Sequence, residues 1–108
     1  MTPKLKTMLA SDGIVVAPGA YDALSAKVAT TEGADAVYMT GFGVSGSILG
    51  MPDVGLLSAT EMADRARAMA SATSPVPLIA DADNGHGGVL NVARMVQLYE
   101  QAGVQCIQ

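Results

Sequence analysis

Apolar and polar residues alternate along this chain in blocks that predict strands and helices taking turns. Short β-branched apolar runs predict buried strands, and longer stretches with apolar residues three and four apart predict amphipathic helices. The predicted strands are 14–17, 36–40, 78–83 and 104–107, and the predicted helices are 4–11, 22–32, 58–71 and 90–102. Such alternation indicates an α/β protein with a parallel sheet and right-handed crossovers.

Several predicted helices carry their own end signals. Asp22 is expected to cap the second helix, and Gly33 fits the position just after its end. Ser58 and Glu61 have the S-x-x-E spacing of a capping box. The glycine-rich stretch 41–57 is predicted to be a long loop. No linker interrupts the pattern, so we expect a single domain.

The pattern gives about three βα units and a fourth strand within 108 residues. These could form a small open sheet. They could equally be the first portion of a (β/α)₈ barrel, which typically needs about 250 residues. The pattern of strands and helices does not choose between these two architectures.

Composition narrows the class of protein. Half of the residues are apolar (50%) and 15% are charged, which excludes an intrinsically disordered chain. The net charge of −4 argues against a nucleic-acid partner, and no apolar run is long enough to span a membrane. Cys106 stands alone in an apolar run and is expected to be a small buried thiol. We expect a cytoplasmic protein without a targeting segment.

Two acidic residues end the third predicted strand. In a strand, residues two apart point to the same side, so Asp81 and Asp83 should face one side together. Paired carboxylates repel each other unless a cation lies near them, and oxygen ligands suit Mg²⁺ or Mn²⁺. The alternative is that Asp83 merely opens a turn.

Other polar groups also follow predicted strands. The backbone and hydroxyl of Thr40 and Gly41 could hold a carboxylate or an oxyanion. Asp53 alone would be an ordinary turn residue after proline. His86, in the glycine-rich segment 84–88, could be a ligand or an acid or base, but is expected to be a solvated loop residue. All these groups lie where parallel α/β folds bind ligands.

Five short motifs in order resemble those of the isocitrate lyase/phosphoenolpyruvate mutase superfamily. They are P-G-A-Y-D-A-L-S-A (18–26), T-G-F-G-V-S (40–45), L-G-M-P-D-V-G (49–55), D-A-D-N-G (81–85) and N-V-A-R (91–94). The resemblance implies a (β/α)₈ barrel of which residues 1–108 are the incomplete N-terminal portion. It also implies a homo-oligomer, a tetramer in full-length relatives, in which Mg²⁺ holds a small carboxylate substrate that reacts through an enolate.

The resemblance also assigns roles by position. Asp81 and Asp83 would hold Mg²⁺ directly or through water. Asp53 would contact substrate or metal from a mobile loop, and Tyr38 would line the site. A second group would bind the pyruvate-like carboxylate of the substrate: Thr40, Gly41 and the backbone of Phe42.

Some residues depart from the superfamily pattern. Thr40 replaces the commoner serine, and Phe42 stands where 2-methylisocitrate lyases carry glycine, which makes their bulky substrate less favoured. Asn84 and His86 replace the usual threonine and aromatic residue. The chain ends at Gln108, before the metal-associated Glu-Asp pair and the cysteine-bearing gating loop of the family.

Three functional readings follow. The first is a Mg²⁺-dependent carbon–carbon lyase of 2-hydroxy or 2-oxo di- or tricarboxylic acids, similar to 2-methylisocitrate lyase or oxaloacetate decarboxylase. The second is a phosphonomutase, which the missing gating loop would distinguish from a lyase. The third is a truncated, non-catalytic chain. We expect the 108-residue chain to be inactive alone.

Overall fold

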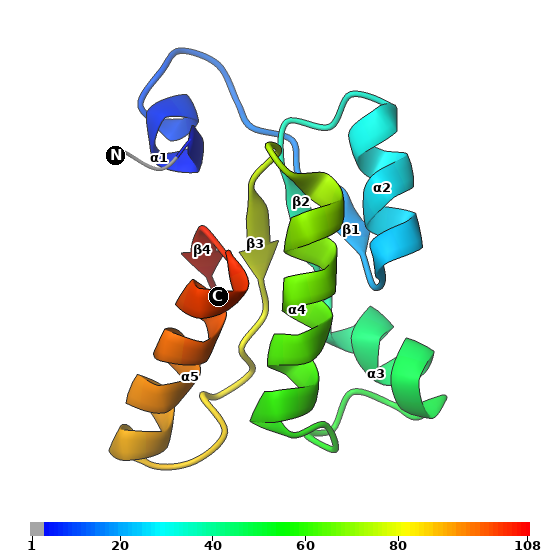
Figure 1. Cartoon of the computed structure of the whole chain (residues 1–108), viewed down its shortest axis with the longest axis vertical. Coiled ribbons are helices and arrows are strands. Elements are labelled where there is room, and N and C mark those ends of the chain that lie inside the picture. Colours follow the sequence, from blue (N-terminus) through cyan, green and yellow to red (C-terminus); the bar gives the residue numbers. More distant parts are fainter. Residues whose placement is uncertain (1–3) are drawn as a thin grey trace.

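The computed structural model describes residues 4–108 and contains one parallel sheet with helices between its strands (Figure 1). The sheet order is β1-β2-β3-β4, so each strand pairs with the next one along the chain. The elements are α1 (Lys4–Leu9), β1 (Gly19–Ala20), α2 (Ala23–Thr31), β2 (Val37–Met39), α3 (Gly41–Leu49), α4 (Ala59–Thr73), β3 (Leu78–Ala80), α5 (Val89–Ala102) and β4 (Cys106–Ile107). This order confirms the predicted α/β class.

Three helices cover one face of the sheet. In Figure 1, α4 lies between α2 and α5, in front of β2 and beside β3, and it contacts both strands. The short helix α3 lies at the carboxyl end of the strands, and α1 lies near their amino end. There the Leu5 N–H donates to the Gln105 side chain at 3.0 Å. At the opposite end, α3 and the connecting loops border the carboxyl edge of the sheet.

The two faces of the sheet differ in burial. Val37, Met39, Leu78 and Ala80 are fully buried towards the helices. The residues between them form a half-buried row across paired strands, consisting of Tyr38, Ile79 and Cys106. Side chains alternate along strands, so this row belongs to the face that the helices leave uncovered. Cys106 is therefore half-buried, not the buried thiol that the sequence predicted.

The core is aliphatic, with one aromatic residue. On α4, the sequence spacing predicts one apolar face of Met62, Ala66, Met69 and Ala70, of which the first three are buried and Ala70 is half-buried. On α5, Tyr99 is 0% exposed and Met95 is buried beside it. The sequence spacing predicts that Val92, Met95, Val96 and Tyr99 share the buried face of this helix, and this is correct only in part, because Val92 is 40% and Val96 is 42% exposed.

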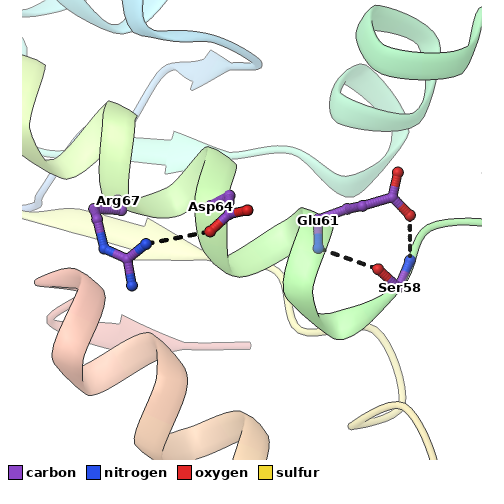
Figure 2. Close-up of polar contacts among 4 residues, drawn as sticks. All are labelled: Ser58, Glu61, Asp64 and Arg67. Atoms are coloured by element: carbon purple, nitrogen blue, oxygen red, sulfur yellow. Dashed lines mark hydrogen bonds and ion pairs between the residues drawn. The ribbon is translucent and has the colours of Figure 1, made fainter.

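Local capping signals were read correctly. The Asp22 carboxylate accepts the Ser25 N–H at 2.7 Å and caps α2. Figure 2 shows the predicted capping box of α4, in which the Ser58 hydroxyl accepts the Glu61 N–H and the Glu61 carboxylate accepts the Ser58 N–H. One turn further, Asp64 and Arg67 form an exposed ion pair at 3.2 Å. Because each cap depends on residues only three apart, sequence alone reveals it.

The first strand is displaced from its predicted position. Residues 14–17 are not a strand, and Ile14 is 86% exposed. The Val16 N–H donates to the Asp35 carboxylate, and the Tyr38 N–H donates to the Pro18 carbonyl at 2.9 Å. Pairing with β2 therefore begins at Pro18, and the strand follows at 19–20.

Two further predictions were wrong at the carboxyl edge. The stretch 41–57 is not entirely a loop, because its first half forms α3, whose N-cap is Thr40. The third strand ends at Ala80, not at Asp83, which has a left-handed φ of 53°. Within residues 4–108, none of the helices is long and apolar enough to cross a membrane.

Candidate functional site

A small pocket lies at the carboxyl end of the sheet, between the start of α3, the loop after α3 and the turn after β3. Its lining residues are Gly41, Ser45, Asp53, Gly55, Leu56, Leu57, Met62, Asp81, Asp83 and His86. The predicted site residues Gly41, Asp53, Asp81 and Asp83 are therefore brought together. They come from three segments that are well separated in the sequence.

The start of α3 packs directly against Asp81. A Cβ built on Gly41 would lie 2.3 Å from Asp81 Oδ2 and 3.6 Å from Asp53 Oδ2. Only glycine allows this approach, which sets both carboxylates beside the first turn of the helix. A helix N-terminus carries partial positive charge and free N–H groups, so negative groups are favoured there.

Asp81 and Asp83 share the pocket for a reason other than strand alternation. Both residues follow the end of β3, and the Asp83 N–H donates to Asp81 Oδ1 at 2.7 Å. This turn carries Asp83 into the pocket, where it lies near Gly55. The prediction that the two carboxylates lie on one side is correct, but its stated cause is not.

A buried tyrosine of α5 forms a hydrogen bond to the backbone of Asp81. The Tyr99 hydroxyl donates to the Asp81 carbonyl at 2.6 Å. Burial, together with the nearby negative charge of Asp81, raises the pKa of Tyr99 far above its ordinary value. Nothing in the sequence signals this contact, because Tyr99 and Asp81 meet only in the folded chain.

Tyr38 lies on the uncovered face of the sheet, close to the same charges. Burial raises its pKa, and the carboxylates of Asp81 and Asp53 raise it further. Its hydroxyl donates to the Gln108 side chain. The charges of Asp81 and Asp53 therefore act on the Tyr38 hydroxyl, although Tyr38 does not line the pocket as the sequence predicted.

The Asp53 loop is anchored by a buried serine. Ser45 is 2% exposed, and its hydroxyl lies 3.1 Å from the carbonyls of both Met51 and Pro52. One hydroxyl proton serves these two acceptors, which immediately precede Asp53. The middle of α3 thus sets where Asp53 meets the pocket, and no signal in the sequence singled out Ser45.

Thr40 and Phe42 do not line the pocket. The Thr40 hydroxyl accepts the Gly43 N–H at 3.2 Å and caps α3, so it is already engaged. The Phe42 side chain is 72% exposed. The substrate contacts predicted for Thr40 and Phe42 stay predictions. Any contact of the Thr40 hydroxyl with substrate would add to its role as the N-cap of α3.

His86 is not the fully solvated loop residue that the sequence predicted. It lines the pocket, and its Nε2 atom is buried without a hydrogen-bond partner. Its backbone has a left-handed φ of 62°, and its N–H donates to the Asn84 side chain at 2.9 Å. The solvated loop residue expected from the sequence is thus partly enclosed.

The carboxylates of the pocket could supply some, but not all, of the ligands of a hard cation. Across residues 4–108, no three Asp, Glu, His or Cys side chains lie close enough together to enclose a metal ion by themselves. Mg²⁺ is, however, commonly held by one or two carboxylates together with several waters. Asp81 and Asp83 offer that minimum, and the space that Gly41 leaves beside Asp81 lets the carboxylate reach the pocket.

Comparison with known proteins gives consistent matches. The family profile described as phosphoenolpyruvate phosphomutase matches residues 5–108. The enzyme 2,3-dimethylmalate lyase of Eubacterium barkeri is 56% identical over 105 residues, covering 97% of this chain and 36% of that protein. The solved structure of oxaloacetate acetylhydrolase with the product oxalate has a TM-score of 0.92 and 42% identity, covering 96% of this chain and 37% of that one.

A third match holds a metal. Phosphonopyruvate hydrolase in complex with oxalate and Mg²⁺ has a TM-score of 0.90 and 38% identity, covering 99% of this chain and 38% of that one. The chain thus spans little more than a third of the length of these relatives. Its fold is the N-terminal portion of their barrel. On these matches, the chain belongs to the phosphoenolpyruvate phosphomutase family, within the superfamily whose motifs its sequence resembles.

Proposed function

We propose that this chain supplies the first part of a Mg²⁺-dependent carbon–carbon lyase that acts on small 2-hydroxy or 2-oxo di- or tricarboxylic acids. The observation that carries the proposal is the meeting of Gly41, Asp53, Asp81 and Asp83 around one pocket at the carboxyl edge. The 56% identity to a 2,3-dimethylmalate lyase supports a lyase and suggests a branched malate as substrate.

Each residue has a chemical task in this proposal. Asp81 and Asp83 would hold Mg²⁺, or Mn²⁺ in its place, directly or through water. The bound cation would act as a Lewis acid that stabilises negative charge developing on a substrate oxygen. The N–H groups at the start of α3, with Thr40 as its cap, would orient the substrate carboxylate. Asp53 would contact substrate or metal from the loop that Ser45 anchors.

The test is an assay of the protein that contains this chain. We expect Mg²⁺-dependent cleavage of 2,3-dimethylmalate or a related hydroxy acid, followed by the release of the 2-oxo acid product. Asp81→Asn should lower kcat/KM by about 10²-fold or more, since it weakens the electrostatic stabilisation of the transition state. Asp64→Asn, on the exposed side of α4, is the control and should stay near wild type. Equal activity in the Asp81 variant would refute the proposal.

A phosphonomutase is the second candidate, because the matching family profile bears that name. The pocket would serve it equally well, since both reactions need a cation beside a carboxylate. Incubation with phosphonopyruvate or phosphoenolpyruvate, followed by ³¹P NMR, separates the two. A change in the phosphorus resonance with no cleavage of hydroxy acids would favour the mutase.

The third candidate is a non-catalytic chain, favoured if residues 1–108 act alone. Within the described part, β1 and β4 each have a neighbour on one side only, which leaves unpaired strand edges. Homo-oligomerisation and a cytoplasmic location are further proposals for the full-length relative. Turnover by the isolated chain would exclude the non-catalytic reading.

A further inference from the structure

His86 Nε2 is a buried polar atom that lacks a partner. It is the sole buried side-chain nitrogen or oxygen of residues 4–108 for which no hydrogen bond is formed. Leaving such an atom unsatisfied costs about 1–3 kcal/mol, so native proteins seldom tolerate it without a ligand or water. A partner supplied from outside the polypeptide would remove this cost.

The charges of the pocket that His86 lines indicate the chemistry of that partner. The charged groups lining the same pocket are three carboxylates, those of Asp53, Asp81 and Asp83, and all of them accept hydrogen bonds. Among residues 4–108, no lysine or arginine side chain lines this pocket. A pocket built from acceptors calls for a species that offers donors and positive charge together. Water bound to a divalent cation does both, because the cation polarises its O–H bonds.

The loop holds the backbone of His86 in place. The His86 N–H donates to the Asn84 side chain, and the Gly85 N–H donates to the Ala82 carbonyl at 2.9 Å. A Cβ on Gly85 would come within 2.5 Å of Val92, so this turn packs tightly on α5. The backbone from which the ring projects is therefore set by the same turn that carries Asp81 and Asp83.

We propose that His86 is a positioning residue whose neutral Nε2 accepts a hydrogen bond from a water molecule bound to the divalent cation. The inference rests on the proposed cation site and goes further, because it gives the orphaned nitrogen a partner outside the polypeptide. Groups that orient metal ligands from outside the coordination sphere commonly change metal affinity by 10–100-fold when they are replaced.

The first test uses the wild-type protein. His86 is the single histidine of this sequence, so its two imidazole ¹⁵N resonances can be followed directly. The titration adds Mg²⁺ at constant pH, so that only the cation concentration changes between samples. We expect both imidazole nitrogens to shift and to saturate at the same Mg²⁺ concentration as the backbone amides of Gly41 and Asp83.

The outcomes separate this inference from the proposed function. If the amides of Gly41 and Asp83 saturate while both imidazole nitrogens stay unchanged, the role of His86 is refuted and the cation site stands. If no resonance responds to Mg²⁺, the cation site itself is refuted and the inference falls with it.

Two variants give an independent readout. His86→Phe keeps a ring but lacks an acceptor, and it should weaken Mn²⁺ binding about tenfold in a calorimetric titration. His86→Gln restores an acceptor and should recover most of that loss. Both substitutions are made at the same backbone φ of 62°, so both variants carry a similar backbone strain. The difference between their Mn²⁺ affinities therefore measures the effect of the hydrogen-bond acceptor. Equal Mn²⁺ affinity in the two variants would overturn the proposal.

Discussion

At the scale of single residues, the tightest contact of the pocket lies at Gly41. Gly41→Ala would place a methyl group 2.3 Å from Asp81 Oδ2, so either the carboxylate or the start of α3 must move. We expect Mn²⁺ affinity to fall about tenfold or more, as for other changes that disturb the setting of metal ligands. Electron paramagnetic resonance of free Mn²⁺ measures this loss.

Gly46 provides a matched control on the same helix. A Cβ there meets no atom within 4 Å, so Gly46→Ala should leave Mn²⁺ affinity unchanged. It should also stabilise the fold by about 0.5–1 kcal/mol, because alanine loses less backbone entropy than glycine in a helix. An equal loss of affinity in both variants would mean that helix integrity, not the Asp81 contact, controls binding.

Tyr99 predicts a pH dependence of stability. Its pKa is raised by burial first and by Asp81 second, so the folded state holds the phenolic proton more tightly than the unfolded state. The stabilisation is complete below the unfolded pKa of about 10 and is lost as pH rises through the folded pKa. We expect the free energy of unfolding to fall above about pH 10, by up to about 1.4 kcal/mol per pH unit.

Tyr99→Phe should reduce that slope, as measured by urea unfolding between pH 8 and about 11. At neutral pH it should cost about 1 kcal/mol, because the hydrogen bond to the Asp81 carbonyl is lost. Tyr21→Phe, at a side chain 45% exposed, is the control and should keep the wild-type slope. A slope unaffected by Tyr99→Phe would contradict this assignment.

At the scale of elements, the capping box of α4 makes a clear prediction. Ser58→Ala removes the side-chain acceptor of the Glu61 N–H and should destabilise the fold by about 1 kcal/mol. Ser71→Ala, at an exposed position within the same helix, should be neutral or slightly stabilising. Thermal unfolding measures both, and equal effects would show that the cap contributes nothing.

Helix α3 shows where pattern reading fails at this scale. Its glycines lower helix propensity, so 41–57 was predicted to be a loop. Packing requires two of these glycines, Gly41 and Gly43. A Cβ on Gly41 would lie 2.3 Å from Asp81 Oδ2, and a Cβ on Gly43 would lie 2.6 Å from Thr40 and 2.8 Å from Tyr21. Tertiary contact, which sequence patterns do not encode, thus overrides propensity here.

At the scale of the whole molecule, the pocket links cation binding to folding. A ligand at 100 times its Kd stabilises the folded state by about 2.7 kcal/mol. We expect urea unfolding of the chain to shift by this amount in saturating Mg²⁺, and Asp81→Asn combined with Asp83→Asn to abolish the shift. An equal shift in the double variant would place the cation elsewhere, and a chain without a cooperative transition would favour the non-catalytic reading.

The sequence by itself determined the α/β alternation, the helix caps, the family and four residues of the pocket. These follow from local periodicity, from capping partners three residues apart and from short motifs in a fixed order. Only the tertiary structure decided that β1 begins at Gly19, that Tyr99 bonds to Asp81, that Ser45 anchors the Asp53 loop and that His86, with a buried and unpartnered nitrogen, lines the same pocket as the carboxylates. Those features depend on strand register and on contacts between distant segments, which form only when the chain folds.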